Sequence, residues 1–446
     1  MILIAPIARL DPVTSSLLVV PALAAALLGG FRSFLIAATA GLAIGMLESE
    51  LLKLQADHGW LPDGIQQGVP FLLVILVMAL RGRSLPTRGD LIQRLLPRSP
   101  TPHHAGVTTL VLAAGAVAGL LTLGSVWRQG IITTTIATLL CLSIVVLTGY
   151  VGQISLAPMA FAGFGGFAVI KFTEAYGIPF PLAPVLAAAA AVALGLLTGL
   201  PAVRVRGMSL ALVTLAAALA VEEIVFRWGW LTGGLGGTDV PPPEIFGMDL
   251  GIAARGTGFP RPAFGILCVI VTALAGLLVA NYRRSLTGLR FLAVRANERA
   301  AAAAGIDVAR TKLTAFAISS FLAGLAGCLL AYQRQTISGD SFLVFLSLSF
   351  LALTYLGGIA GVSGAVIAGL LAQGGLVTVA LDQTGGDAAE YQFAISGVVL
   401  VVVAVAYPDG IAGAVRSAWE RLTRIVRPGG STGRAQTAGR AGTVAS

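Results

Sequence analysis

Apolar segments of membrane-spanning length fill most of the chain and are separated by short polar stretches. A helix needs about 20 apolar residues to cross a bilayer, and about 13 segments approach that length. They lie near residues 16–30, 33–49, 67–80, 106–124, 130–149, 155–173, 183–202, 208–228, 262–281, 312–332, 342–358, 363–381 and 391–407. None alternates apolar and polar positions as strands do, and a helix satisfies its own backbone hydrogen bonds within lipid. The pattern predicts an all-α, polytopic helical membrane protein.

The composition excludes a soluble enzyme and a disordered chain. Of the 446 residues, 56% are hydrophobic and only 11% are charged, whereas an average soluble domain has about 25% charged residues. The formal net charge is +9. The basic residues stand between the apolar segments, however, as they do where charge orients membrane helices. The expected partner surface is therefore the lipid bilayer and not nucleic acid.

No motif for catalysis or metal binding occurs in the sequence. The three cysteines, Cys141, Cys268 and Cys328, each lie inside an apolar segment without metal-ligand spacing. A phosphate-binding loop of the form GxxxxGK[ST] is missing, as are the HExxH and GxSxG motifs. We therefore expect no metal site, no bound cofactor and no enzymatic activity in this chain. The protein is expected to move a solute, with any ATP energy supplied by a partner.

The distribution of basic residues predicts how the helices are oriented. Lys and Arg concentrate in the polar stretches 81–105, 203–207 and 282–311 and after residue 412. Because cytoplasmic loops carry an excess of these residues, the loop 282–311 and the C-terminus are predicted to be cytoplasmic. The basic, then Gly-, Thr- and Ala-rich tail 413–446 is predicted to be disordered.

An internal repeat suggests two units of unequal length. Gly29-Gly30 stands before Gly41 as Gly357-Gly358 stands before Gly369, and each copy follows one apolar segment and continues into another. Residues near the N-terminus thus resemble the last three helices of a longer unit, and repeated architecture is common in transporters. The expected organisation is an N-terminal fragment over 1–90, a cytoplasmic linker over 91–105, a unit of about ten spans over 106–412, and the tail 413–446.

Glycines spaced four residues apart predict where helices approach one another. Without Cβ atoms, two helix backbones can pack closely in a membrane. Such pairs occur at Gly195/Gly199 and at Gly357/Gly361, where Gly358 adds a second glycine. These five residues are therefore candidates for helix packing.

Two polar segments are candidates for a translocation path. A glycine-dense break follows residue 148, and irregular backbone at membrane depth must be covered by protein or line a cavity. An acidic pair ends the segment 208–228, and carboxylates within membrane helices are costly unless they are functional. The candidate residues are Tyr150, Gly152, Ser155, Glu222, Glu223, Thr232, Gly233 and Gly234. The alternatives are an ordinary cytoplasmic turn for the break and an interfacial position beside Arg227 for the acidic pair.

The loop 282–311 contains the signals of a short helix. Asn297 is suited to begin it, Glu298 stands in its first turn, and Gly305 is suited to end it in a left-handed conformation. A short cytoplasmic helix of this kind suits docking into another protein, although a solvated basic loop is the alternative. The candidate docking residues are Arg295, Asn297, Glu298, Ala303, Gly305 and Lys312.

At this point the sequence resembles a known family. The run 288–327, the segment 147–163, the motifs at 204–207 and 232–234, and the glycines at 357–361 occur in the order typical of LivM-type permeases of branched-chain amino acid ABC importers. Residues 1–90 are similar to the C-terminal end of the companion LivH-type permease, so that the chain looks like a gene fusion. One departure is Pro158, which stands where the family often has a different residue and would constrain the next helix.

The resemblance implies more than the residues alone. It implies a permease bundle that carries branched-chain amino acids across the bacterial inner membrane by alternating access. It also implies two cytoplasmic LivG/LivF-like ATPases that use ATP and magnesium, a LivH-like companion permease and a periplasmic substrate-binding protein. The loop around Glu298 and Gly305 would then seat in an ATPase. A urea or short-chain amide permease, and a non-transporting membrane scaffold, are the alternative functions.

Overall fold

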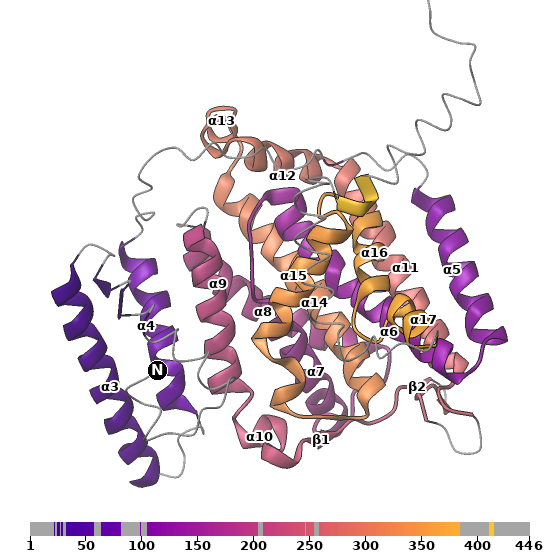
Figure 1. Ribbon diagram of the computed structural model, residues 1–446, viewed down its shortest axis with the longest axis horizontal. Helices are drawn as coiled ribbons and strands as arrows, with labels where there is room; N and C mark the ends of the chain where they lie inside the picture. The colour runs from indigo at the N-terminus through magenta and orange to yellow at the C-terminus, as the bar shows by residue number, and fades with distance from the viewer. Residues whose placement is uncertain are drawn as a thin grey trace, which may run out of the picture.

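Helices running side by side form the bulk of the molecule, as the computed structural model shows (Figure 1). It describes residues 22, 25–26, 28–29, 33–57, 64–81, 99, 105–203, 208–245, 247–253, 258–383 and 410–413. The α-helices in this part are α3 (Phe34–Asp57), α4 (Ile65–Arg81), α5 (Ala105–Thr122), α6 (Ser125–Ile144), α7 (Pro158–Glu174), α8 (Leu182–Val203), α9 (Met208–Ala220), α10 (Gly229–Thr232), α11 (Pro262–Arg284), α12 (Leu286–Ala296), α13 (Glu298–Ala303), α14 (Val308–Arg334), α15 (Val344–Gly357), α16 (Val362–Leu371) and α17 (Leu376–Gln383).

Shorter elements extend or connect these helices. A π-helix, Val145–Tyr150, continues α6, and another, Val221–Val225, continues α9. The remaining elements are the 3-10 helices Gly234–Gly236 and Gly339–Phe342 and the strands β1 (Thr238–Asp239), β2 (Glu244–Ile245), β3 (Met248–Asp249) and β4 (Thr336–Ile337). The strands form two antiparallel pairs, β1 with β4 and β2 with β3.

The predicted helical membrane class is confirmed. Within the described ranges, 8 helical segments are long and apolar enough to cross a membrane. The predicted total of about 13 spans is not confirmed by this number. The segment 391–407 and most of 16–30 lie outside the described residues, and α4, α7 and α9 have 17, 17 and 13 residues.

The predicted span over 363–381 coincides with one of these membrane-crossing segments, Val362–Gln383, but a turn interrupts its helix. Helix α16 ends at Leu371, and α17 begins at Leu376 after a turn. In that turn Gly374 has a φ of 72°, a left-handed conformation that glycine adopts without steric cost. The main-chain nitrogen of Gly375 donates to the Ala372 carbonyl oxygen at 2.8 Å. Gln373 and the two glycines at 374–375 thus interrupt a segment that hydropathy alone predicts to be one continuous helix.

Helix α14 lies at the centre of the bundle and packs against α6, α7 and α8. The side facing α8 brings Ser320 and Phe316 against Gly195 and Gly199, where a Cβ atom would overlap Ser320 and approach the Phe316 ring at 3.1 Å. The other predicted packing glycines lie elsewhere. Gly357 and Gly358 end α15, Gly361 begins α16, and a Cβ on Gly357 would overlap the Gly364 carbonyl oxygen.

Replacing Gly327 with valine is expected to destabilise the bundle. A Cβ atom at this position of α14 would overlap the carbonyl oxygen of Ala162 in α7, so one of the two helices would have to move. Overpacking of this kind costs about 1–3 kcal/mol of folding free energy, and the thermal unfolding temperature of the protein in detergent should fall. Gly115→Val in α5 is the matched control because nothing lies within 4 Å of a Cβ there. Equal shifts for the two variants would contradict the close packing.

The two described helices of the N-terminal fragment contact the rest of the chain mainly through α9 and the π-helix that continues it, and also through α8. They stand at one edge of the molecule, with α4 between α3 and α9 (Figure 1). Gly68 of α4 lies against Ile224, and Gly64, just before α4, lies against the Glu223 carbonyl oxygen. The predicted linker 91–105 is described only at Ser99 and Ala105, and the tail 413–446 only at its first residue.

The loops that follow the helices gather at two opposite ends of the bundle. Helices α12 and α13 lie at one end, and α10 lies with strand β1 at the other (Figure 1). Strand β4 follows α14 directly and pairs with β1, with Thr238 opposite Ile337. Helix α14 therefore runs from the end with the candidate docking loop to the opposite end.

Candidate functional site

A large cavity lies between α6, α7, α14, α15 and the turn that separates α16 from α17. Its volume is about 1340 Å³, larger than the roughly 300–1,000 Å³ of most small-ligand pockets. A single small solute would not fill it. Selectivity in such a space must come from a few polar groups and not from a tight fit.

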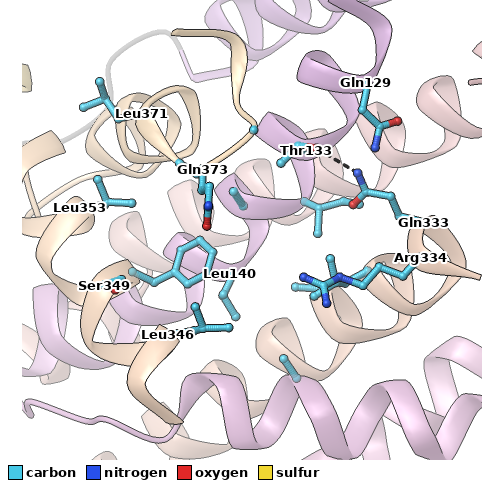
Figure 2. Close-up of a pocket in the computed structure, with 18 of the residues that line it drawn as sticks. Gln129, Thr133, Leu140, Gln333, Arg334, Leu346, Ser349, Leu353, Leu371 and Gln373 are labelled. Carbon is cyan, nitrogen blue, oxygen red and sulfur yellow. Dashed lines mark hydrogen bonds between the residues drawn. The ribbon is translucent and has the colours of Figure 1, made fainter. Parts of the chain in front are cut away.

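The walls of this cavity differ in polarity (Figure 2). The apolar wall comes mainly from α6 and α15, with Leu140, Leu346, Phe350 and Leu353. Polar side chains gather on the opposite side and come from the first half of α6 and the end of α14: Gln129, Thr133, Gln333 and Arg334. Gln373, from the α16–α17 turn, lies nearer the apolar wall, beside Leu140. Nε2 of Gln333 donates to Oγ1 of Thr133 at 2.9 Å and joins α14 to α6 there.

The predicted break after residue 148 lies inside the protein and does not line this cavity. Tyr150 is buried in the π-helix that extends α6, and Gly152 and Ser155 lie in the connection to α7. Neighbouring helices satisfy the irregular backbone, since Leu156 N donates to Thr214 Oγ1 at 3.1 Å and Met159 N donates to Ser347 Oγ at 3.0 Å. Pro158 takes the first position of α7, which a proline tolerates.

The predicted acidic pair has partners within the chain. Glu222 Oε2 accepts a hydrogen bond from the main-chain nitrogen of Val344 at 2.8 Å, at the start of α15. Glu223 lies 2.6 Å from Arg227, one helical turn away. The candidates Thr232, Gly233 and Gly234 end α10 and start the adjoining 3-10 turn. None of these residues is among those that line the large cavity.

Helix α13 begins and ends where its sequence signals predicted. The Asn297 side chain accepts hydrogen bonds from the main-chain nitrogens of Arg299 and Ala300 at 2.9 and 3.1 Å. Gly305 has a φ of 82°, and the next residue, Ile306, donates back to the Ala301 carbonyl oxygen at 3.0 Å. This pair of caps stabilises a helix of only 6 residues. Ala303 and Gly305 are exposed on it.

Two of the candidate docking residues point into the protein instead of outward. The Lys312 side chain is 0% exposed, and its Nζ lies 2.8 Å from Glu298 Oε1, so that the pair ties α13 to the first turns of α14. Arg295 Nη1 donates to the Gly149 carbonyl oxygen at 2.5 Å. Burial lowers the pKa of Arg295 from its usual value, but an arginine stays protonated in proteins. Direct contact of Lys312 with another protein is therefore excluded in this conformation.

The candidate docking loop and the cavity are connected by the same two helices. Lys312 and Arg334 lie near opposite ends of α14, separated by 22 residues and hence by roughly 33 Å of helix. The α6 segment carries Gln129 near its start and Gly149 in its π-helical end. Between these ends, Ser319 Oγ of α14 donates to the Ser143 carbonyl oxygen of α6 at 2.9 Å. Both helices thus provide a continuous set of contacts between the candidate docking loop and the cavity.

The described part of the chain has no cluster of metal-binding side chains. No group of three or more His, Cys, Asp or Glu residues there could hold a metal ion. All three cysteines are fully buried, each in a different helix. What the site offers is a large, mostly apolar cavity with a few polar groups, which suits binding and passage of a small solute.

Comparison with known proteins finds similar sequences among branched-chain amino acid permeases. The chain is 31% identical over 305 residues to the permease protein LivM of the high-affinity branched-chain amino acid transport system of Escherichia coli, covering 63% of this chain and 69% of the relative. It is 30% identical to LivM of Salmonella typhimurium over 62% of this chain and 69% of that protein. A probable permease protein LivH of Methanocaldococcus jannaschii is 26% identical over 60% of this chain and 85% of its own length.

The family match extends over most of the second unit. No solved structure matches the chain. The family model described as the permease component of the branched-chain amino acid transport system matches residues 126–404. Apart from Ser125, that range contains all the residues that line the cavity, together with the candidate docking loop and the helices α6 and α14. The chain belongs to the branched-chain amino acid transport permease family.

Proposed function

We propose that this chain is the translocating subunit of an ATP-driven ABC importer that carries branched-chain amino acids across the bacterial inner membrane. The family membership and the relatives named LivM support the substrate class. The observation that carries the proposal is α13, a short capped helix held by the Glu298–Lys312 ion pair at the end of a helix that reaches the cavity. A scaffold without transport would need neither the cavity nor this connection.

The proposed mechanism is alternating access. Two LivG/LivF-like ATPases hold α13 and its flanking residues in the cytoplasm and use ATP and magnesium themselves. Their closure favours one of two helix packings, because a ligand shifts an equilibrium by its difference in affinity for the two states. The α6 and α14 helices transmit the shift to the cavity. In this orientation the loop 282–311 and the C-terminus are cytoplasmic, and Arg334 and Gln333 lie toward the periplasm.

Two further partners complete the proposal. A LivH-like companion permease would supply the second half of the passage, and a periplasmic binding protein would deliver the solute. The fragment 1–90 would derive from the end of a LivH-type permease. The repeat supports this origin, because α3 begins at Phe34 where α16 of the longer unit begins at Val362, at the same separation that relates Gly29 to Gly357.

Site-specific cross-linking tests this function together with uptake. With Ala303, which is exposed on α13, replaced by cysteine, a thiol cross-linker is expected to join the chain to an ATPase subunit. ATP-dependent uptake of labelled leucine by the same complex in vesicles is expected as well. Gly115→Cys is the control, because α5 is largely exposed there and lies away from the docking loop. The native cysteines are buried and give little background. Uptake without cross-linking would contradict the docking assignment, and absence of uptake would contradict the transport function.

A further inference from the structure

The cavity contains one charged side chain among the residues that line it in the described part of the chain. This is Arg334, at the end of α14. No carboxylate lines the cavity beside it, and no carboxylate of the described residues lies within ion-pair distance of it. Among the described residues the Arg334 guanidinium thus has no counter-ion. Its side chain is exposed and can attract an anionic group, and its planar fork fits a carboxylate through two parallel hydrogen bonds.

The backbone around Arg334 is fixed on both sides. The preceding Gln333 is bonded to Thr133 of α6 at 2.9 Å. The following Gln335 adopts a left-handed conformation, donates to the Ala331 carbonyl oxygen at 3.0 Å and accepts from Val240 N at 2.7 Å. The next two residues form β4, paired with β1. These contacts orient Arg334 so that its guanidinium points into the cavity (Figure 2).

A second polar group in the same region supplies an acceptor. Gln129 Oε1 is buried and makes no hydrogen bond with any described residue, and a buried acceptor without a partner is costly. An ammonium group could satisfy it by donating a hydrogen. The opposite wall, with Leu140, Leu346 and Leu353, is apolar and would accept an aliphatic side chain (Figure 2). One side of the cavity thus matches the two charged groups of an amino acid, and the other side matches an aliphatic chain.

We infer that Arg334 binds the carboxylate of the solute in this cavity and makes the chain select aliphatic amino acids over neutral amides of the same shape. The inference rests on the proposed transport function and names the residue that determines this selectivity. Arg334 is offered as a binding residue, with Gln129 as the acceptor for the ammonium group. The carbonyl oxygen of a urea or an amide would accept weaker hydrogen bonds from this guanidinium than a carboxylate does.

Protection of a cavity cysteine from alkylation tests this binding directly. Ser349 lines the cavity and is exposed to it, so the reporter is Ser349→Cys in the assembled complex, with the native cysteines buried. L-Leucine is expected to slow alkylation of this reporter, and L-leucinamide should do so only at higher concentration. Adding Arg334→Gln should raise the leucine concentration for half protection by about tenfold, because the glutamine amide can keep one of the two parallel hydrogen bonds but loses the other together with the charge. Leucinamide protection should not weaken, because the amide has no negative charge to lose a partner and its ammonium group is repelled by Arg334.

Lys171→Gln is the matched control for charge. Lys171 lies near the end of α7, over the Trp230 ring of α10, and does not line the cavity. It should leave the leucine concentration unchanged, and equal effects of Arg334→Gln and Lys171→Gln would overturn the inference. Unchanged leucine protection in Arg334→Gln would also overturn the inference. If the reporter complex still takes up leucine in that case, the proposed transport function stands. A complex with the native Arg334 that neither takes up leucine nor is protected by it would overturn both.

Discussion

Replacing Lys312 with methionine is expected to abolish most ATP-driven uptake and to weaken the binding of the ATPases. The Lys312 side chain is 0% exposed and that of Glu298 is 15% exposed, with 2.8 Å between their charged atoms. Removal of one partner from such a pair leaves an uncompensated charge and costs about 3–5 kcal/mol. Because Glu298 stands in the first turn of α13, the docking helix would lose its attachment to α14. Uptake in vesicles and ATPase co-purification measure the two effects.

The adjacent ion pair provides a matched control. Arg310 lies 3.2 Å from Asp307 in the first turn of the same helix, but the two side chains are 87% and 52% exposed. An exposed pair of this kind contributes about 0–1 kcal/mol, so Arg310→Met should change uptake little. The double variant Glu298→Gln with Lys312→Met should recover part of the ATPase binding, because neutral groups remove the unpaired charge. Equal loss in Lys312→Met and in the double variant would show that the ion pair does not hold α13.

The sequence was sufficient where the determining interactions are local. The start of α13 at Asn297 and its end at Gly305 depend on contacts within a few residues, and both were predictable from residue type and spacing. The apolar segments likewise located most spans, because length and hydropathy decide membrane insertion. The interruption at Gly374 was missed, although a glutamine and two glycines in an apolar segment are a turn signal.

The cavity could not be predicted because its polar side chains come from distant parts of the chain. Gln129 lies near the start of α6, Arg334 is the last residue of α14, and Gln373 lies in the turn between α16 and α17. Each alone has the features of an ordinary residue at a membrane boundary, and only the packing of α14 on α6 brings them together. The acidic pair stood out in the sequence because carboxylates within membrane helices are costly. In the structure, however, Glu222 accepts a hydrogen bond from Val344 N and Glu223 pairs with Arg227.

Replacing Arg295 with methionine is expected to uncouple ATP hydrolysis from transport while leaving the ATPases bound. The Arg295 guanidinium, in the last turn of α12, donates to the carbonyl oxygen of Gly149 in the buried π-helix that ends α6. A hydrogen bond from a charged donor contributes about 1.5–3 kcal/mol, which corresponds to about tenfold to a hundredfold in an equilibrium constant. Without it, α6 would no longer follow the docking loop. Leucine uptake should fall by that factor, with ATPase co-purification unchanged.

The Arg295 side chain points toward α6, and this decides both the choice of a control variant and the difference expected from Lys312→Met. Arg290 is exposed on the same helix, so Arg290→Met removes the same charge from α12 without removing a contact to α6, and uptake should persist. Lys312→Met acts on the attachment of α13 and should lower ATPase binding, whereas Arg295→Met acts beyond the attachment and should not. ATP hydrolysis by the reconstituted complex should therefore continue in the Arg295 variant in the absence of solute movement. Loss of ATPase binding in this variant would instead place Arg295 in the docking surface itself. It would also contradict the proposal that α6 transmits the movement of the ATPases to the cavity.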